Sequence, residues 1–339
     1  MIETFLASLI EPITLASAGI AIFKPLYWLF GVVMGFFMDI FSNNYFISIV
    51  LFTLLTRLIL FPFNLRQQRN TAKTARLQPK IQKIQNRYKN SKDPKAQQKM
   101  QEEIQELYNR EGHNPMQMGC GTMIFQMVFL MGIVGIIYYP LSYVIGISEI
   151  ADLTTELTEL VETLGYDGNY LQLGILENWS SYKDALVEAY PEIFTETVSA
   201  EIEAYREGMY LFGLDMTAVP HWADGVIVVV PLLSFATSAG STAISMIIQR
   251  KNNPAAATQS KGQTIMMSIM MPLFSLYIAF QVPAAVGFYW IISNCVAIIQ
   301  QLFIAKAFPP RKTQAKLMVE NTIVRRSREE SIKKTKLKD

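Results

Sequence analysis

Cysteine and histidine are scarce in this chain. Its 339 residues include two of each, too few for a disulfide framework or a zinc cluster. Cys120 and Cys295 lie at the edge of or inside apolar runs. We find no glycine-rich phosphate loop and no pairing of a nucleophile with a base. The sequence therefore predicts no metal, no cofactor and no catalytic site, and we expect that the protein is not an enzyme.

Acidic residues are absent from the long apolar runs. Half of the residues are apolar (51%), and the mean hydropathy is +0.22. Five runs are long enough to cross a bilayer as helices, which takes about 20 residues, and none contains Asp or Glu. They are 46–63, 121–145, 225–248, 264–280 and 284–308. The fold class that we predict is an all-α integral membrane protein with five transmembrane helices.

Charge is unevenly distributed between these runs. Segment 66–113 carries 12 Lys/Arg against 5 Asp/Glu, and 306–339 carries 11 against 4. Segment 149–224 has the opposite bias, with 16 acidic residues and only two basic ones. Basic loops stay in the cytoplasm. We therefore expect a multi-pass protein with its amino end outside, its carboxyl end inside, and 149–224 outside.

The amino-terminal region allows two interpretations. Residues 5–37 are apolar but are interrupted by Glu11, Pro12, Lys24 and Pro25. The start lacks a basic region and a small-residue cleavage site, so we expect no cleaved signal peptide. The segment after Lys24 is either a sixth span or an amphipathic helix lying flat on the outer leaflet. We expect the flat helix.

Two amphipathic patterns follow the first span. Leu77, Ile81, Ile84 and Tyr88 share one helical face, as do Met100, Ile104, Leu107 and Tyr108. Between them "SKDP" offers a capping Asp93 and a Pro94 suited to a first helical position. The pattern predicts a basic cytoplasmic helical hairpin. It is either a solvated loop or a docking surface, for which the candidate residues are Arg76, Lys80, Lys83, Arg87 and Tyr88.

Arg57 lies inside the first span. It is nine residues before Arg66, which corresponds to about 13 Å along a helix and places it near the bilayer centre. An arginine on lipid costs from about 3 to more than 10 kcal/mol. Because the spans contain no acid, we expect Arg57 to face the interior of the helix bundle and that interior to be wet.

Other spans also carry polar residues. On the fifth span the polar residues fall on one side of the helix. The candidate groove residues are Arg57, Gln126, Ser238, Trp290, Ser293, Asn294 and Gln300. Hydrogen bonds between helices explain the serines and threonines equally well. A positive, wet cavity is consistent with a pore, a transporter site or a landing place for a polar polypeptide segment.

Several motifs, in this order, resemble the YidC/Oxa family of membrane protein insertases, in its five-span Gram-positive form. They are "TRLILFPFNLRQQ" (56–68), Asn114–Pro115, Gly119–Cys120, "FQM" (125–127) and 266–301, which includes Tyr289–Trp290 and Ser293–Asn294. The resemblance covers about 25–145 and 210–308. Thr122 and Val128 stand where the family usually has prolines, and the acidic segment is much longer than the usual outer loop.

The resemblance implies a hydrophilic groove, open to the cytoplasm and to lipid, in which Arg57 attracts acidic residues of a substrate. It implies nascent membrane proteins as clients and the ribosome, the signal recognition pathway, the Sec translocon and membrane lipids as partners, without recognition of a specific nucleic-acid sequence. It places the chain in the bacterial cell membrane. An anion or solute transporter using the Arg57 cavity is the alternative; a structural scaffold or assembly chaperone is the third interpretation.

Seven segments follow from these patterns. They are 1–43 (amino-terminal apolar segment and interfacial helix), 44–66 (first span), 67–118 (hairpin), 119–146 (second span), 147–223 (acidic extracellular insert), 224–308 (third, fourth and fifth spans) and 309–339 (basic cytoplasmic tail). The pattern within the acidic insert predicts short amphipathic helices.

Overall fold

The computed structural model describes residues 23–88, 93–110, 120–166, 168, 170–252 and 266–307, and a few isolated residues between 319 and 330. Residues 1–22 and most of the expected cytoplasmic tail lie outside the described residues, as do the side chains of Arg76 and Gln126. The chain divides into two compact units. Unit 1 comprises 1–59, 125–242 and 266–297, and unit 2 comprises 60–124, 243–265 and 298–339.

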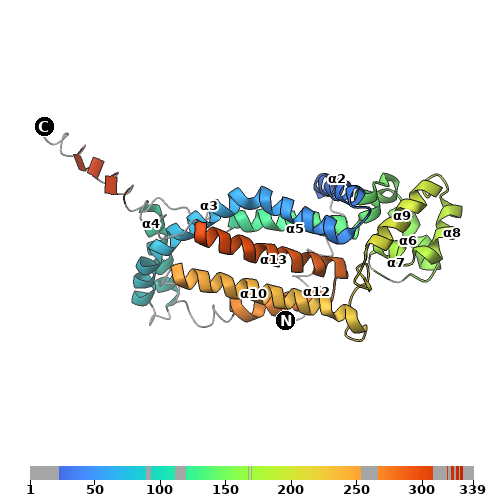
Figure 1. Ribbon diagram of the computed structural model, residues 1–339. Helices are drawn as coiled ribbons and strands as arrows, with labels where there is room; N and C mark the ends of the chain where they lie inside the picture. Colours follow the sequence, from blue (N-terminus) through green and yellow to red (C-terminus); the bar gives the residue numbers. More distant parts are fainter. Residues whose placement is uncertain are drawn as a thin grey trace. The chain divides into compact units, whose positions relative to one another are not determined.

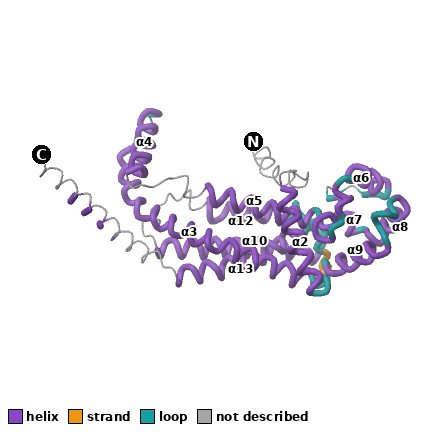
Figure 2. Tube along the Cα trace, turned by 90° about the horizontal axis from the view of Figure 1, so that it is seen from above, coloured by secondary structure: helices purple, strands orange, loops and turns teal. Residues whose placement is uncertain are grey.

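Helices account for nearly all the regular structure of the described residues (Figure 1). The long or apolar helices are α2 (Lys24–Ile40), α3 (Tyr45–Tyr88), α5 (Cys120–Tyr138), α10 (Val229–Asn252), α12 (Met271–Ala279) and α13 (Ala284–Ala307). The others are α4 (Pro94–Arg110), α6 (Thr154–Thr163), α7 (Leu171–Glu177), α8 (Trp179–Ala189) and α9 (Glu196–Gly208). Two short strands, β1 (Tyr210–Leu211) and β2 (Leu214–Asp215), form an antiparallel hairpin, drawn in orange in Figure 2.

Three helical stretches within the described residues are long and apolar enough to cross a membrane. They are Tyr45–Gln68, Gly225–Lys251 and Ala284–Ala307, which match the first, third and fifth spans expected from the sequence. The second and fourth correspond to the shorter apolar helices Met127–Tyr138 and Ser268–Ala279. The all-α membrane fold is therefore confirmed.

The second apolar run is not one regular helix. α5 ends at Tyr138, and Pro140 precedes a short π-helix, Leu141–Ile145. Proline has no backbone N–H, so it cannot continue the hydrogen-bond ladder of α5. Gly146 then closes the turn with a left-handed φ of 93°. Sequence hydropathy alone could not show this change of helix type.

α3 joins the first span to the hairpin without a break. Its 44 residues run through Pro62 and Pro79, although we had assigned the span and the hairpin to separate segments meeting at residues 66 and 67. Each proline removes one helical hydrogen bond, and long helices of membrane proteins tolerate this loss.

In unit 1, α2 packs closely on the chain that follows α5. A side chain at Gly31 would collide with the carbonyl oxygen of Tyr143, and one at Gly35 would approach that of Val144. Small residues four apart allow such a backbone approach. The opposite face of α2 is exposed and apolar, with Phe36 58% and Ile40 55% exposed. This face suits the interfacial position that we expected for the helix.

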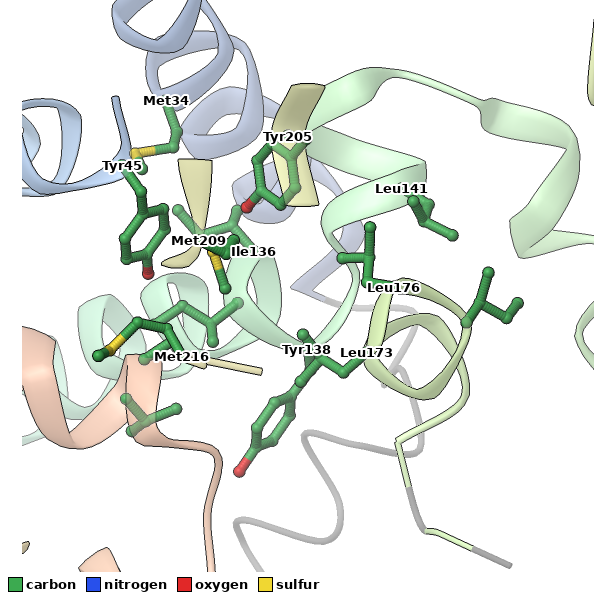
Figure 3. Close-up of a cluster of buried hydrophobic side chains, with 14 of the residues drawn as sticks. Met34, Tyr45, Ile136, Tyr138, Leu141, Leu173, Leu176, Tyr205, Met209 and Met216 are labelled. Atoms are coloured by element: carbon green, nitrogen blue, oxygen red, sulfur yellow. The ribbon is translucent and has the colours of Figure 1, made fainter. Parts of the chain in front are cut away.

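The core of unit 1 connects α2, α3 and α5 to the insert. Figure 3 shows Met34, Tyr45, Ile136, Leu176 and Met209 among the buried side chains of this cluster. They come from elements far apart in the sequence. The insert is therefore packed onto the apolar helices of unit 1.

Short helices make up most of the insert, as its amphipathic pattern predicted. Trp179, Leu186, Phe194 and Ile202 form its own core and are fully buried. The β1–β2 hairpin that follows α9 was not predicted. Its strands have two residues each, too few for a hydrophobic alternation to show in the sequence.

Backbone hydrogen bonds fix the insert to the beginning of α13. The amide of Ala284 donates to the carbonyl of Ala218 at 2.9 Å, and that of Ala285 donates to Met216 at 2.8 Å. The first amides of a helix have no partner within it, so these carbonyls satisfy groups that would otherwise be orphaned. Tyr170 adds a third bond from its hydroxyl to the carbonyl of Gln281 at 3.1 Å.

We predict that Gly31→Ala destabilises the protein, whereas Gly240→Ala does not. Both glycines lie in helices, so both substitutions gain the same helix propensity, about 1 kcal/mol. A methyl group at Gly31 collides with the backbone of Tyr143, whereas nothing lies within 4 Å of one at Gly240. Thermal unfolding of the detergent-purified variants measures the difference. Equal melting temperatures would contradict the close packing of α2.

Candidate functional site around Arg57

Arg57 of α3 is held by Ser293 of α13. Its Nη2 donates to the backbone carbonyl of Ser293 at 3.1 Å and to the Ser293 hydroxyl at 2.5 Å. The guanidinium is half-buried, and Ser293 is buried. The two side chains, which are 236 residues apart in the sequence, thus meet inside unit 1, to which both residues belong.

Arg57 has a partner within the protein, because Ser293, one of the predicted groove residues, accepts both bonds from Nη2. A guanidinium has five N–H donors, of which Nη2 carries two. Nε and Nη1 find no acceptor, and no acid pairs with Arg57, among the residues that the structure describes. Ser293 therefore orients the guanidinium without neutralising it.

The polar neighbours of Arg57 on α3 are satisfied within their own helix. Thr53 donates its hydroxyl to the Ile49 carbonyl at 2.6 Å, and Thr56 donates to the Thr53 carbonyl at 2.9 Å. Both threonines are buried. Such bonds to the preceding turn make a hydroxyl compatible with an apolar setting. Arg57 differs from them because its partner lies on another helix.

α13 and α10 are joined by side-chain hydrogen bonds. Asn294 donates from Nδ2 to the Thr237 hydroxyl at 3.4 Å, which is a long bond. Further along the same two helices, in unit 2, Ser245 donates to Oε1 of Gln301 at 2.9 Å. Membrane helices commonly associate through such contacts. These polar groups therefore also hold the helices together, the structural role that the sequence left open.

One face of α13 is polar or buried and the other is exposed and apolar. Ser293 and Ala297 are buried, whereas Ile299, Leu302 and Phe303 are more than half exposed. The exposed side suits lipid, and the polar side carries the partners of Arg57 and α10. The segregation agrees with the one-sided pattern found in the sequence.

The structure brings only some of the predicted groove residues together. Ser293 contacts Arg57, and Asn294 on the next position bonds to α10. Ser238, Trp290 and Gln300 are half-buried, but no hydrogen bond links them to Arg57 within the described residues. On α10, the hydroxyl that accepts the bond from Asn294 belongs to Thr237 rather than to its predicted neighbour Ser238.

The hairpin residues form a separate site in unit 2. Leu77, Ile81 and Ile84 are buried, so the predicted apolar stripe of the first helix is confirmed. Tyr88 donates its hydroxyl to Oε1 of Glu103 at 2.7 Å, and Arg87 forms a 2.8 Å ion pair with the other oxygen. These two candidate docking residues thus bind α3 to α4.

The lysines of the predicted docking surface are exposed. Lys80 and Lys83 both lie on the exposed face of α3. Arg87 is 62% exposed despite its ion pair with Glu103. The hairpin therefore presents basic side chains to solvent, while its own closure uses one of them. In the described part of the chain, no three His, Cys, Asp or Glu side chains gather closely enough to bind a metal.

These features define a class of protein: an all-α membrane protein with polar groups, among them an arginine, between its apolar helices. Comparison with protein families narrows the class further. Residues 36–312 match the family described as 60Kd inner membrane protein. The match covers most of the chain, and the protein belongs to this YidC/Oxa1 family.

Curated relatives carry names consistent with this family. The chain is 28% identical over 310 residues to "Membrane protein insertase YidC 2" of Listeria innocua, covering 91% of this chain and 79% of that protein. It is 29% identical to "Membrane protein insertase YidC" of Clostridium perfringens, covering 87% and 95%. It is 26% identical to "Membrane protein insertase MisCA" of Bacillus subtilis, covering 78% and 71%.

We predict that Ser293→Ala destabilises the protein by about 1 kcal/mol, because the lost bond has a charged donor in a weakly polar setting. Ser234→Ala is the matched control: Ser234 is fully buried on α10, and its hydroxyl has no partner within the described residues. The control should be neutral or stabilising. Unfolding of both variants by denaturing detergent measures the difference, and equal losses would contradict the role of Ser293.

Proposed function

We propose that this protein is a membrane protein insertase that receives polar segments of nascent membrane proteins next to Arg57. The observation that carries the proposal is the family match over residues 36–312. The curated relatives named as insertases support it. Arg57, oriented by Ser293, supplies the chemistry that such a role needs. In this proposal five spans surround a hydrophilic groove, and the chain acts without enzymatic chemistry.

Charge attraction is the first step. A guanidinium binds carboxylates with paired N–H donors. Because Ser293 occupies only Nη2, the Nε and Nη1 donors remain for an acidic substrate side chain. The attraction is stronger than in water, since the local dielectric constant is lower. An acidic segment near a substrate span is thus drawn into the membrane beside Arg57.

Hydrophobic transfer supplies the free energy of the second step. Each buried CH₂ group of the substrate span contributes about 0.8 kcal/mol, so a whole span outweighs the cost of moving a short polar segment. The exposed side of α13, with Leu302 and Phe303, is an apolar surface along which that span can move into lipid. Nucleotide hydrolysis is not needed for this step.

The charge pattern supports an orientation with the amino end outside and the basic hairpin in the cytoplasm. There Lys80 and Lys83 would meet the ribosome, the signal recognition pathway or anionic lipid headgroups. Cooperation with the Sec translocon on larger substrates is part of the same proposal. It rests on the family resemblance rather than on any described contact.

We predict that Arg57→Lys retains most insertion activity and that Arg57→Ala loses it for substrates with an acidic tail. Lysine keeps the charge that attracts carboxylates, although it cannot form the paired bonds of arginine. Cells depleted of the native protein and complemented with each variant would be scored for insertion of a single-span substrate.

A substrate with the same span and an uncharged tail is the control, and its insertion should change little. If Arg57→Ala inserted the acidic-tailed substrate as well as the wild type, charge attraction would be excluded. Photo-crosslinking from position 290 to a stalled nascent chain tests the path itself. Saturable anion uptake by purified protein in liposomes would instead support the transporter alternative.

A further inference from the structure

The turn of the β1–β2 hairpin carries a residue that does not suit it. Tyr210 pairs with Asp215, and Leu211 pairs with Leu214, which leaves Phe212 and Gly213 as a two-residue turn. Both have left-handed φ values, 54° and 78°. Turns of this kind favour Asn-Gly or Asp-Gly, because a bulky side chain with positive φ crowds the backbone. Phenylalanine is therefore disfavoured by the local backbone.

Burial within the protein does not explain Phe212 either. Its side chain is 82% exposed, the most exposed of the large apolar residues described. Its ring makes an edge contact with Phe46, at 5.9 Å between centroids. A strained backbone and an exposed ring are two separate costs at one position. Such an outlier is a reason to look for a partner outside the chain.

The position of Phe212 shows which partner is available. Phe46 is the second residue of the apolar stretch Tyr45–Gln68, and its ring also contacts Phe288 near the start of α13, at 5.9 Å. Phe212 thus lies beside the amino-terminal ends of two helices long enough to cross a membrane. If these helices cross a bilayer, their amino-terminal ends lie at one of its two surfaces.

A second exposed aromatic residue lies next to the third such helix. Trp222 is 70% exposed and precedes Gly225, where the apolar stretch Gly225–Lys251 begins. Its ring stacks on Phe280 with centroids 4.2 Å apart. Val226, just after it, is 69% exposed. Exposed aromatic rings therefore mark the same end of all three helices.

We propose that Phe212, with Trp222 as a second contact, inserts into the headgroup–acyl boundary of the bilayer and anchors the insert to the membrane surface. Aromatic residues concentrate at this boundary. Between 149 and 224 the insert has 16 acidic residues and only two basic ones, so it offers few cations for lipid headgroups and an uncharged aromatic anchor suits it. The proposal depends on the membrane helices and not on insertase activity.

Spin-label depth measurements test the anchor in the full-length protein. In a background with Cys120→Ser and Cys295→Ser, a nitroxide on Tyr210→Cys, which leaves Phe212 in place, is compared with one on Glu188→Cys. Glu188 is exposed on α8, which lies at the end of unit 1 away from the membrane helices (Figures 1 and 2). In nanodiscs the label at 210 should be relaxed more by oxygen than by a water-soluble nickel chelate, and the label at 188 should show the reverse.

Two outcomes at position 210 would overturn the proposal. Strong relaxation by the nickel chelate means that the turn lies in water. Protection from both reagents means that protein covers the turn, either a partner or a second copy of the chain. Either result leaves the insertase proposal intact, because neither involves Arg57.

Two substitutions separate an anchor from a residue that only shapes the turn. Phe212→Leu keeps an apolar side chain but not a good turn former, whereas Phe212→Asn supplies the preferred turn residue and removes the apolar group. With the label on Tyr210→Cys, we predict that Phe212→Leu keeps the wild-type depth. Phe212→Asn should raise the ratio of the label's accessibility to the nickel chelate over its accessibility to oxygen several-fold. The opposite order, with Asn keeping the depth better than Leu, would show a purely local role.

Discussion

The hydrogen bonds between Arg57 and Ser293 are the interaction on which the membrane part of unit 1 depends. A guanidinium inside an apolar helix requires polar neighbours, because its charge is costly in lipid. α13 provides them by turning the carbonyl and hydroxyl of Ser293 towards α3. Since serine carries no charge, the cation is positioned but stays a cation. The same contact therefore permits the arginine to be partly buried and leaves its positive charge without a counter-charge among the described residues.

The insert contributes to the position of Ser293. Carbonyls of Met216 and Ala218 accept the first amides of α13, and Ser293 follows Ala285 by eight residues, about 12 Å along the helix. A straight helix transmits its starting position over that length. The acidic insert thus has a structural consequence at the site: it fixes the amino-terminal end of the helix that orients Arg57.

Two kinds of feature could be predicted from the sequence: a residue type that is costly in its surroundings, and apolar residues that recur at helical spacing. Arg57 stood out because a cation in an acid-free apolar run is unfavourable in any fold. Leu77, Ile81 and Ile84 stood out by spacing. The exact partner could not be derived, because Ser293 lies 236 residues away and is one of several polar residues on its helix. The π-helix at Leu141–Ile145 and the β1–β2 hairpin depend on backbone geometry that hydropathy does not record.

Phe212 and Arg57 illustrate two kinds of unfavourable residue. The cost of Arg57 can be recognised from its residue type and the apolar residues around it in the sequence, whereas a phenylalanine in a loop is common and signals no cost. Its cost appears only once φ, exposure and neighbours are known together. Both residues lie in unit 1 and each lacks full compensation inside the described chain. For Arg57 the missing compensation is negative charge, and for Phe212 it is apolar contact, so the partners that we propose for them differ: an acidic polypeptide segment and a lipid surface.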